Sequence, residues 1–170
     1  PDQALVPVVL APGIGAAVTQ GTINPESPIG LRQLLTDGAG AREAIDALLE
    51  IDEQPTVRQY SVVVFDDEDD DEDDNAERAD VAAYTGQDVE LERGDRTGPA
   101  VSVQGVLLAD QAVLDRSLAA YGQARADGRS FEEALVDGLV AGSDAGGDRR
   151  CGEQTALFAH LVVAEPGDDP

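Results

Sequence analysis

The sequence contains no lysine, tryptophan or methionine, and only one cysteine and one histidine in 170 residues. Its single cysteine, Cys151, has no partner for a disulfide within the chain, which excludes a secreted disulfide scaffold. The sequence also lacks paired zinc ligands, a phosphate-binding loop, a dinucleotide fingerprint and a nucleophile elbow. We therefore expect no metal site and no cofactor, and we assign no catalytic residue.

Basic residues are scarce, with 11 arginines against 35 acidic residues and a net charge of -24. Phosphate binding depends on clustered basic side chains, so this charge argues against nucleic acid and anionic membranes as partners. No apolar run approaches the roughly 20 residues that span a bilayer. We expect a soluble protein.

The acidic excess predicts a halophilic protein of a salt-rich cytoplasm. Molar salt shortens the Debye length to about 3 Å and so weakens the repulsion within an acidic shell. A high-GC genome is the alternative explanation, and it accounts for the missing lysine but not for the excess of Asp and Glu. Because the chain begins at Pro1, directly before an apolar stretch, we also expect the natural N-terminus to lie upstream.

The length predicts one domain over residues 1–170 with one core of small aliphatic side chains. Alternating and β-branched patterns predict strands, whereas apolar residues at helical spacing and N-cap signals predict helices. The expected strands are Leu5–Leu10, Gly13–Gly21, Val57–Phe65, Val81–Tyr84, Ala100–Leu108 and Thr155–Val163. We expect Val57–Phe65 and Val81–Tyr84 to pair in antiparallel orientation. The first expected helix begins at Ser27-Pro28, with Ser27 as its N-cap, and runs to Thr36, and the second lies around Ala41–Leu49. The third covers Asp110–Ala126, and the fourth covers Phe131–Ala141 after a capping-box pattern at Ser130 and Glu133, with Phe131, Leu135 and Leu139 facing inward. Strands and helices grouped in pairs favour an α+β fold of antiparallel sheets covered by helical layers.

Nine consecutive carboxylates occupy Asp66–Asp74. Such a block repels itself and remains solvated, so we expect a flexible acidic loop over residues 66–79. Calcium binding is the alternative interpretation, but the ligand spacing and turn glycine of an EF-hand loop are absent.

Few residues offer catalytic chemistry. His160 is the only histidine and lies within an apolar stretch, which favours a structural role over a catalytic one. Cys151 follows Arg149 and Arg150, whose charge would activate a thiolate, although a lone cysteine in a loop is more often incidental.

The densest polar cluster is Asp148-Arg149-Arg150, which glycines flank. An arginine here would bind a carboxylate through both nitrogens while Asp148 orients it. The alternative is an internal salt bridge that fixes the loop.

Several short motifs resemble the domain of unknown function 1028 family. In chain order they are Val18-Thr19-Gln20, Asn24-Pro25, Leu34-Leu35 with Gly38, Arg58-Gln59, Tyr84-Thr85-Gly86, Val103-Gln104-Gly105 and Gly146-Gly147-Asp148-Arg149-Arg150. They extend over nearly the whole chain, which makes the match more specific than any single motif.

The resemblance implies the fold of the N-terminal nucleophile (Ntn) hydrolases, a four-layer αββα sandwich of antiparallel sheets, here lacking its first strands. It implies hydrolysis of an amide bond in a small or peptide-like substrate, with the nucleophile upstream of Pro1. The polar residues expected to line the pocket are Thr19, Asn24, Gln104, Asp148, Arg149 and Arg150.

Two other functions remain open. One is a non-catalytic module of the same fold that binds a ligand or assembles with neighbours, and a homo-oligomer is expected if edge strands are covered by a partner. The other is a peptidoglycan-related accessory protein, suggested only by an extra domain that some family members carry.

Overall fold

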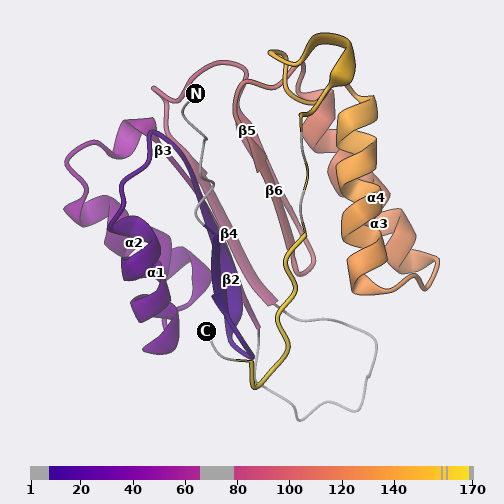
Figure 1. The fold of residues 1–170 in the computed structure, drawn as a ribbon. Helices are drawn as coiled ribbons and strands as arrows, with labels where there is room; N and C mark the ends of the chain where they lie inside the picture. The colour runs from indigo at the N-terminus through magenta and orange to yellow at the C-terminus, as the bar shows by residue number, and fades with distance from the viewer. Residues whose placement is uncertain (1–7, 66–78, 158, 160, 169–170) are drawn as a thin grey trace.

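The computed structural model describes residues 8–65, 79–157, 159 and 161–168, and these form an α+β arrangement of antiparallel sheets and helices (Figure 1). The strands are β1 (Val8–Ala11), β2 (Gly15–Gly21), β3 (Arg58–Phe65), β4 (Ala79–Thr85), β5 (Gly94–Gly98) and β6 (Val101–Gly105). The α-helices are α1 (Ser27–Thr36), α2 (Ala41–Ile51), α3 (Ala112–Ala126) and α4 (Phe131–Asp144), with short 3-10 helices at Pro55–Val57 and Gly152–Gln154. The prediction of a mixed α+β fold with antiparallel sheets is confirmed.

The first sheet has the strand order β1-β2-β3-β4, and every neighbouring pair is antiparallel. Its register places Thr19 opposite Tyr60 and Tyr60 opposite Tyr84. Because side chains alternate between the two faces of a strand, Tyr60 and Val62 point to one face and Gln59 and Ser61 to the other. This alternation divides an apolar face from a polar one.

Helices α1 and α2 cover the apolar face (Figure 1). The core beneath them contains the fully buried side chains Leu31, Leu35, Ile45 and Val62. The sequence pattern predicted Ser27 as the N-cap of α1, but Ser27 lies inside the helix and Glu26 occupies the cap without a side-chain hydrogen bond. The Ser27 hydroxyl instead lies 3.0 Å from the Tyr60 hydroxyl, so a tertiary contact replaces the local cap.

The second sheet is the antiparallel hairpin β5-β6. The sequence pattern predicts a single strand over Ala100–Leu108, of which β6 forms part, and does not predict β5. The sequence of β5, Gly-Asp-Arg-Thr-Gly, has few residues that favour strands. Packing explains the two glycines. A Cβ added at Gly94 or Gly98 would lie only 3.1 or 3.0 Å from a methyl carbon of Leu114 or Leu118 on α3, so the small residues allow close packing of helix on hairpin.

Helices α3 and α4 lie side by side, and α3 covers the outer face of the hairpin (Figure 1). The predicted capping box at the start of α4 is confirmed, since Ser130 accepts from the Glu133 amide and Glu133 accepts from the Ser130 amide. Of the three residues of α4 predicted to face inward, Leu135 packs against a buried cluster, and Phe131 is 39% exposed although its ring contacts that of Tyr121. The prediction is wrong for Leu139, which is 51% exposed. The buried residues of α4 are small, namely Ala134, Gly138 and Gly142, because α4 packs closely against α3.

Three predictions concern segments that the structure describes only in part. The prediction of a strand over Thr155–Val163 is wrong, because none of the described residues in that range belongs to a strand. Two of its apolar residues, Leu157 and Val162, are 76% and 54% exposed. Residues 66–78 of the expected acidic loop lie outside the described residues. Ala79, the last residue of that prediction, is the first residue of β4. His160 and the start of the first expected strand, up to residue 7, also lie outside them.

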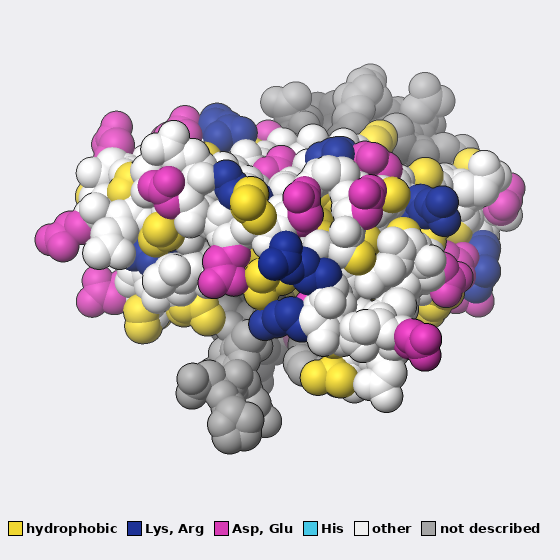
Figure 2. Space-filling model, turned by 90° about the horizontal axis from the view of Figure 1, so that it is seen from above, with side chains coloured by type: hydrophobic (Ala, Val, Ile, Leu, Met, Phe, Trp, Pro, Cys, Tyr) yellow, Lys and Arg dark blue, Asp and Glu magenta, His cyan; other side chains and the backbone are white. Residues whose placement is uncertain are grey.

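The two sheets face each other, with β3 and β4 contacting β5 and β6. Along the chain's described ranges, no helix combines the length and apolar character needed to cross a membrane. Seen from above, acidic side chains are spread over the surface with arginines among them (Figure 2).

Candidate functional site

Polar side chains of the two sheets meet between them, and we call this set the inter-sheet polar layer (Gln20, Gln59, Ser61, Thr85, Asp95, Ser102 and Gln104). Gln59 lies at its centre on β3 and is 0% exposed. Its amide nitrogen donates to the Thr85 hydroxyl and to the Gly94 carbonyl of the opposite sheet, both at 2.9 Å. One side chain therefore joins strands of both sheets.

Hydroxyl groups continue the layer along the strands. The Ser61 hydroxyl lies 2.8 Å from that of Ser102 and donates to the Gln104 side-chain oxygen at 2.7 Å. At the end of β4, the Thr85 hydroxyl donates to the Asp95 carboxylate at 2.5 Å. Facing sheets ordinarily interdigitate apolar side chains, so a polar contact surface here is unusual.

Two acceptors of the layer have no hydrogen-bond partner within the described residues, the side-chain oxygens of Gln20 and Gln59. An unpaired buried acceptor costs about 1–3 kcal/mol. Buried groups that remain unpaired at this cost are candidates for binding a ligand. A donor such as an N–H would satisfy either oxygen.

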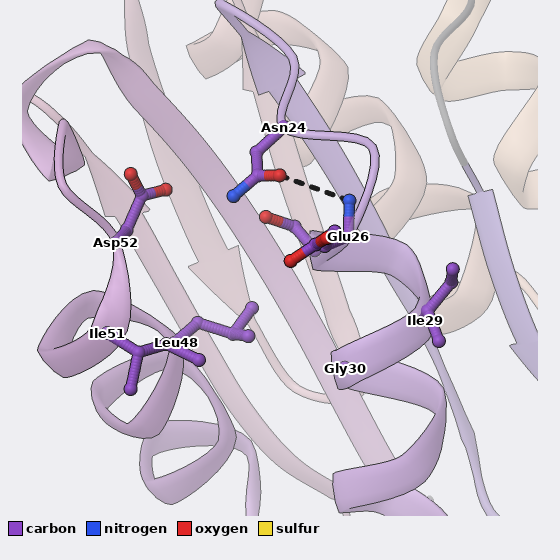
Figure 3. A pocket seen from close by; sticks show the side chains of 8 residues that line it. Asn24, Glu26, Ile29, Gly30, Leu48, Ile51 and Asp52 are labelled. Carbon is purple, nitrogen blue, oxygen red and sulfur yellow. Dashed lines mark hydrogen bonds between the residues drawn. The ribbon is translucent and has the colours of Figure 1, made fainter.

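A pocket lies on the other side of the first sheet, between the start of α1 and the end of α2 (Figure 3). Its volume is about 410 Å³. The lining residues are Asn24, Glu26, Ser27, Ile29, Gly30, Leu48, Ile51 and Asp52. The pocket therefore combines apolar walls with two carboxylates.

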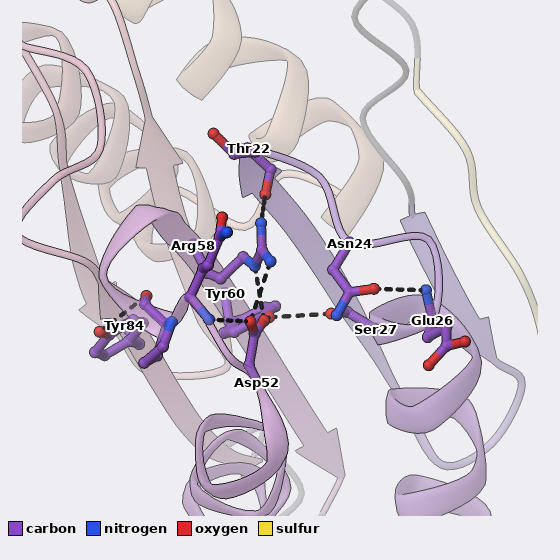
Figure 4. Close-up of polar contacts among 10 residues, drawn as sticks. Thr22, Asn24, Glu26, Ser27, Asp52, Arg58, Tyr60 and Tyr84 are labelled. Atoms are coloured by element: carbon purple, nitrogen blue, oxygen red, sulfur yellow. Dashed lines mark hydrogen bonds and ion pairs between the residues drawn. The ribbon is translucent and has the colours of Figure 1, made fainter.

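Asp52, which lines this pocket, forms a buried ion pair with Arg58 (Figure 4). The Arg58 guanidinium binds both carboxylate oxygens of Asp52, at 2.7 and 3.0 Å, and donates to the Thr22 carbonyl at 2.6 Å. The two side chains are only 10% and 3% exposed. The hydrogen bond from Arg58 lowers the pKa of Asp52 to about 2, against an opposing effect of burial. Burial raises the pKa of the neighbouring Tyr60 hydroxyl.

The six predicted site residues do not share one pocket. Gln104 belongs to the inter-sheet polar layer, whereas Asn24 lines the pocket near α1. Thr19 is 2% exposed, and its hydroxyl has no hydrogen-bond partner in the described part of the chain. Asp148, Arg149 and Arg150 lie in the loop after α4, which is anchored to the segment after β6 by a bridge between Asp148 and Leu108. The first sheet separates Asn24 from the polar layer.

Within that loop, Arg150 pairs with Asp148. The Arg150 Nε donates to the Asp148 carboxylate at 2.9 Å, and this pairing lowers the pKa of Asp148. The Arg149 backbone donates to the Leu107 carbonyl at 3.0 Å, while its side chain is exposed and makes no polar contact with any described residue. The geometry leaves Arg149, rather than Arg150, available to a ligand. Cys151 follows as a half-buried free thiol.

Sequence reasoning missed Gln59 and Ser61 as site residues and Asp52 with Arg58 as a buried pair. A usable signal was present, since β3 begins with four polar or hydroxyl-bearing residues, Arg58-Gln59-Tyr60-Ser61, and all four are buried. Polar residues on both faces of a strand that should be buried indicate polar tertiary contacts. Their partners come from distant segments, which the sequence does not identify.

The arrangement provides amides, hydroxyls and carboxylates rather than a complete catalytic set. Among the described residues, no group of three or more His, Cys, Asp or Glu is placed to hold a metal ion. The layer offers hydrogen-bond donors and acceptors for a polar ligand, and the pocket offers apolar contacts and negative charge.

Two facing antiparallel sheets with a polar interior and helix pairs outside define an α+β protein with an internal polar site. A family model described as a family of unknown function, DUF1028, matches residues 3–169. The chain belongs to this family.

Among solved structures, the chain is similar to the crystal structure of protein SPO2555 from Silicibacter pomeroyi, a DUF1028 protein. The two share 23% sequence identity with a TM-score of 0.64, and the match covers 81% of this chain and 58% of that one. At this identity the likeness establishes the fold alone, and the chain spans little more than half the length of that relative. No curated protein matches the chain.

Proposed function

We propose that the chain forms most of an Ntn-hydrolase-like αββα sandwich and that the inter-sheet polar layer binds the amide substrate of a hydrolase. The order of α1 and α2, first sheet, hairpin, and α3 and α4 supports the four-layer part of this proposal. The hairpin has only two strands among the described residues, and the exposed apolar residues Leu157, Leu161 and Val162 follow it in the chain. Both features support a second sheet that is completed by further strands.

The observation that carries the functional proposal is the buried Gln59 oxygen without a partner. An amide substrate has an N–H that would donate to this oxygen and a carbonyl that would accept from the Gln104 amide nitrogen, whose contact with the Val18 carbonyl is long at 3.5 Å. A buried polar group costs free energy unless it is hydrogen-bonded, so the layer favours a polar substrate over an apolar one.

In enzymes of this type the nucleophile is a Thr, Ser or Cys at the start of a strand, and its own amine acts as the base. The nucleophile attacks the substrate carbonyl carbon, the C–N bond breaks, and the amine leaves with a proton. Water then releases the acyl group. The described residues would supply binding and orientation for these steps.

The test is an amide-substrate panel assayed with the full-length protein in 2 M KCl, by detection of the released amine. We expect turnover of at least one small or peptide-like amide, and higher turnover in 2 M than in 0.1 M KCl, because salt weakens the repulsion within a chain of net charge -24. A folded sample without turnover across the panel contradicts the hydrolase.

The second candidate is a ligand-binding module of the same fold. It is favoured by the separation of Asn24, Gln104 and Arg149 into different regions. Saturable binding of an amide by calorimetry, together with no release of amine, would support this alternative.

A further inference from the structure

The pocket between α1 and α2 is separated from the inter-sheet polar layer by the first sheet, and its lining differs in character. Its walls are largely apolar. Leu48 forms part of the wall, and Ile29 and Ile51 are 71% and 79% exposed (Figure 3). Large exposed apolar side chains beside a concave site lose contact with water when a ligand's apolar part covers them.

Gly30 keeps this pocket open. It lies inside α1, where glycine costs about 1 kcal/mol relative to alanine. A Cβ at this position would lie 3.0 Å from the Leu48 Cδ2 atom and would extend into the space that both residues line. Gly30 therefore lowers the helix propensity of α1 at a position where a side chain would reduce the volume of the pocket.

The pocket's electrostatics favour a cation. The Glu26 carboxylate lines the pocket and has no hydrogen-bond or ion-pair partner within the described residues. Asp52 neutralises the charge of Arg58, so Arg58 does not compensate the negative charge of Glu26. Helix α2 ends at the pocket with no basic residue in its last turn, and the C-terminal end of a helix carries partial negative charge.

The N-terminal end of α1 carries partial positive charge, which offsets the negative charge of the pocket only in part. Its flanking amides are already occupied, since the Glu26 amide donates to the Asn24 side chain and the Ser27 amide donates to the Asn24 carbonyl. The uncompensated charge in the pocket is therefore negative.

We propose that this pocket binds an organic monocation with a short apolar chain, such as an alkylguanidinium or the side chain of a basic peptide residue. The cation lies between Glu26 and the C-terminal end of α2. Its apolar chain packs on Leu48 and between Ile29 and Ile51. The binding site is independent of amide hydrolysis, because none of its residues belongs to the polar layer.

The probe is n-butylguanidinium chloride, titrated into the full chain at constant ionic strength while the methyl signals of Ile29 and Ile51 are followed by NMR. Saturable shifts of both methyls are expected. Pentan-1-ol, which has no charge, and pentanoate, which has the opposite charge, are expected to bind more weakly. No saturation, or equal binding of pentanoate, would overturn the proposal.

Three variants sharpen the test. Glu26→Gln is expected to weaken binding about threefold to fivefold, as for an exposed ion pair. Gly30→Ala is expected to weaken binding as well, while improved helix propensity keeps the protein folded. Glu53→Gln is the matched control, because it removes the same charge from an exposed residue that does not line the pocket. If Glu53→Gln weakens binding as much as Glu26→Gln, the effect is one of general charge and the proposed site is wrong.

Discussion

Replacing Arg58 with leucine lowers the free energy of unfolding by about 3–5 kcal/mol, because the change leaves the Asp52 carboxylate buried without its counter-charge. The Asp52 side chain is 3% exposed and receives two hydrogen bonds from Arg58. The carbonyl of Thr22 loses its arginine donor as well. Urea unfolding in molar KCl, followed by circular dichroism, measures the change.

The matched control is Arg42→Leu. Arg42 pairs with Asp46 at 3.8 Å, and both side chains are more than half exposed. An exposed pair of this kind contributes at most about 1 kcal/mol. In addition, leucine at both Asp52 and Arg58 is expected to recover much of the lost stability, since no buried charge then remains. A loss for Arg58→Leu as small as that for Arg42→Leu would show that the pair is not buried as described.

Acidification removes the contribution of Asp52 to stability. Its pKa in the folded protein is lowered from 3.8 to about 2, so the folded state favours the ionised carboxylate. The contribution is fully present above pH 3.8, decreases as the pH falls below that value, and is lost below about pH 2. The size of the shift corresponds to about 2 kcal/mol.

The measurement compares the wild type with Asp52→Asn between pH 5 and 2. Protonation of the many other carboxylates also relieves repulsion within the acidic chain, and the difference between the two proteins cancels this common effect. We expect the difference in unfolding free energy to shrink as the pH falls through this range. A constant difference would mean that Asp52 has an ordinary pKa.

The helices and the first sheet were largely predictable because their signals are local. The Ser27-Pro28 pair identified the start of α1, apolar residues at helical spacing identified α2, and the capping box at Ser130 identified the start of α4. The β-branched run before Phe65 identified β3, and its antiparallel pairing with β4 was also expected. Each of these features is encoded within a few neighbouring residues.

The errors arise where tertiary contacts override local pattern. Strand β5 has weak strand propensity, and its glycines fit only because α3 packs against it. The apolar run after Thr155 has the pattern of a strand, but its described residues pair with no neighbour. A sequence pattern indicates that a segment suits a strand, and does not show whether a partner strand is available.

The predicted site residues lie in separate regions of the fold. Gln104 and Asn24, for example, lie on opposite faces of the first sheet. Gln59 and Ser61 were not recognised, because an alternation within β3 does not reveal that the face they occupy is covered by a second sheet.

The most direct test of the account is the triple variant Ser61→Ala/Ser102→Ala/Gln104→Leu, measured for both unfolding free energy and amide turnover. Ser61 forms hydrogen bonds with both Ser102 and Gln104, so replacing the three side chains together by apolar groups leaves few unpaired partners. If the layer serves substrate binding, stability stays the same or rises while turnover is lost. A large loss of stability with turnover unchanged would show that the layer is structural and would contradict the account.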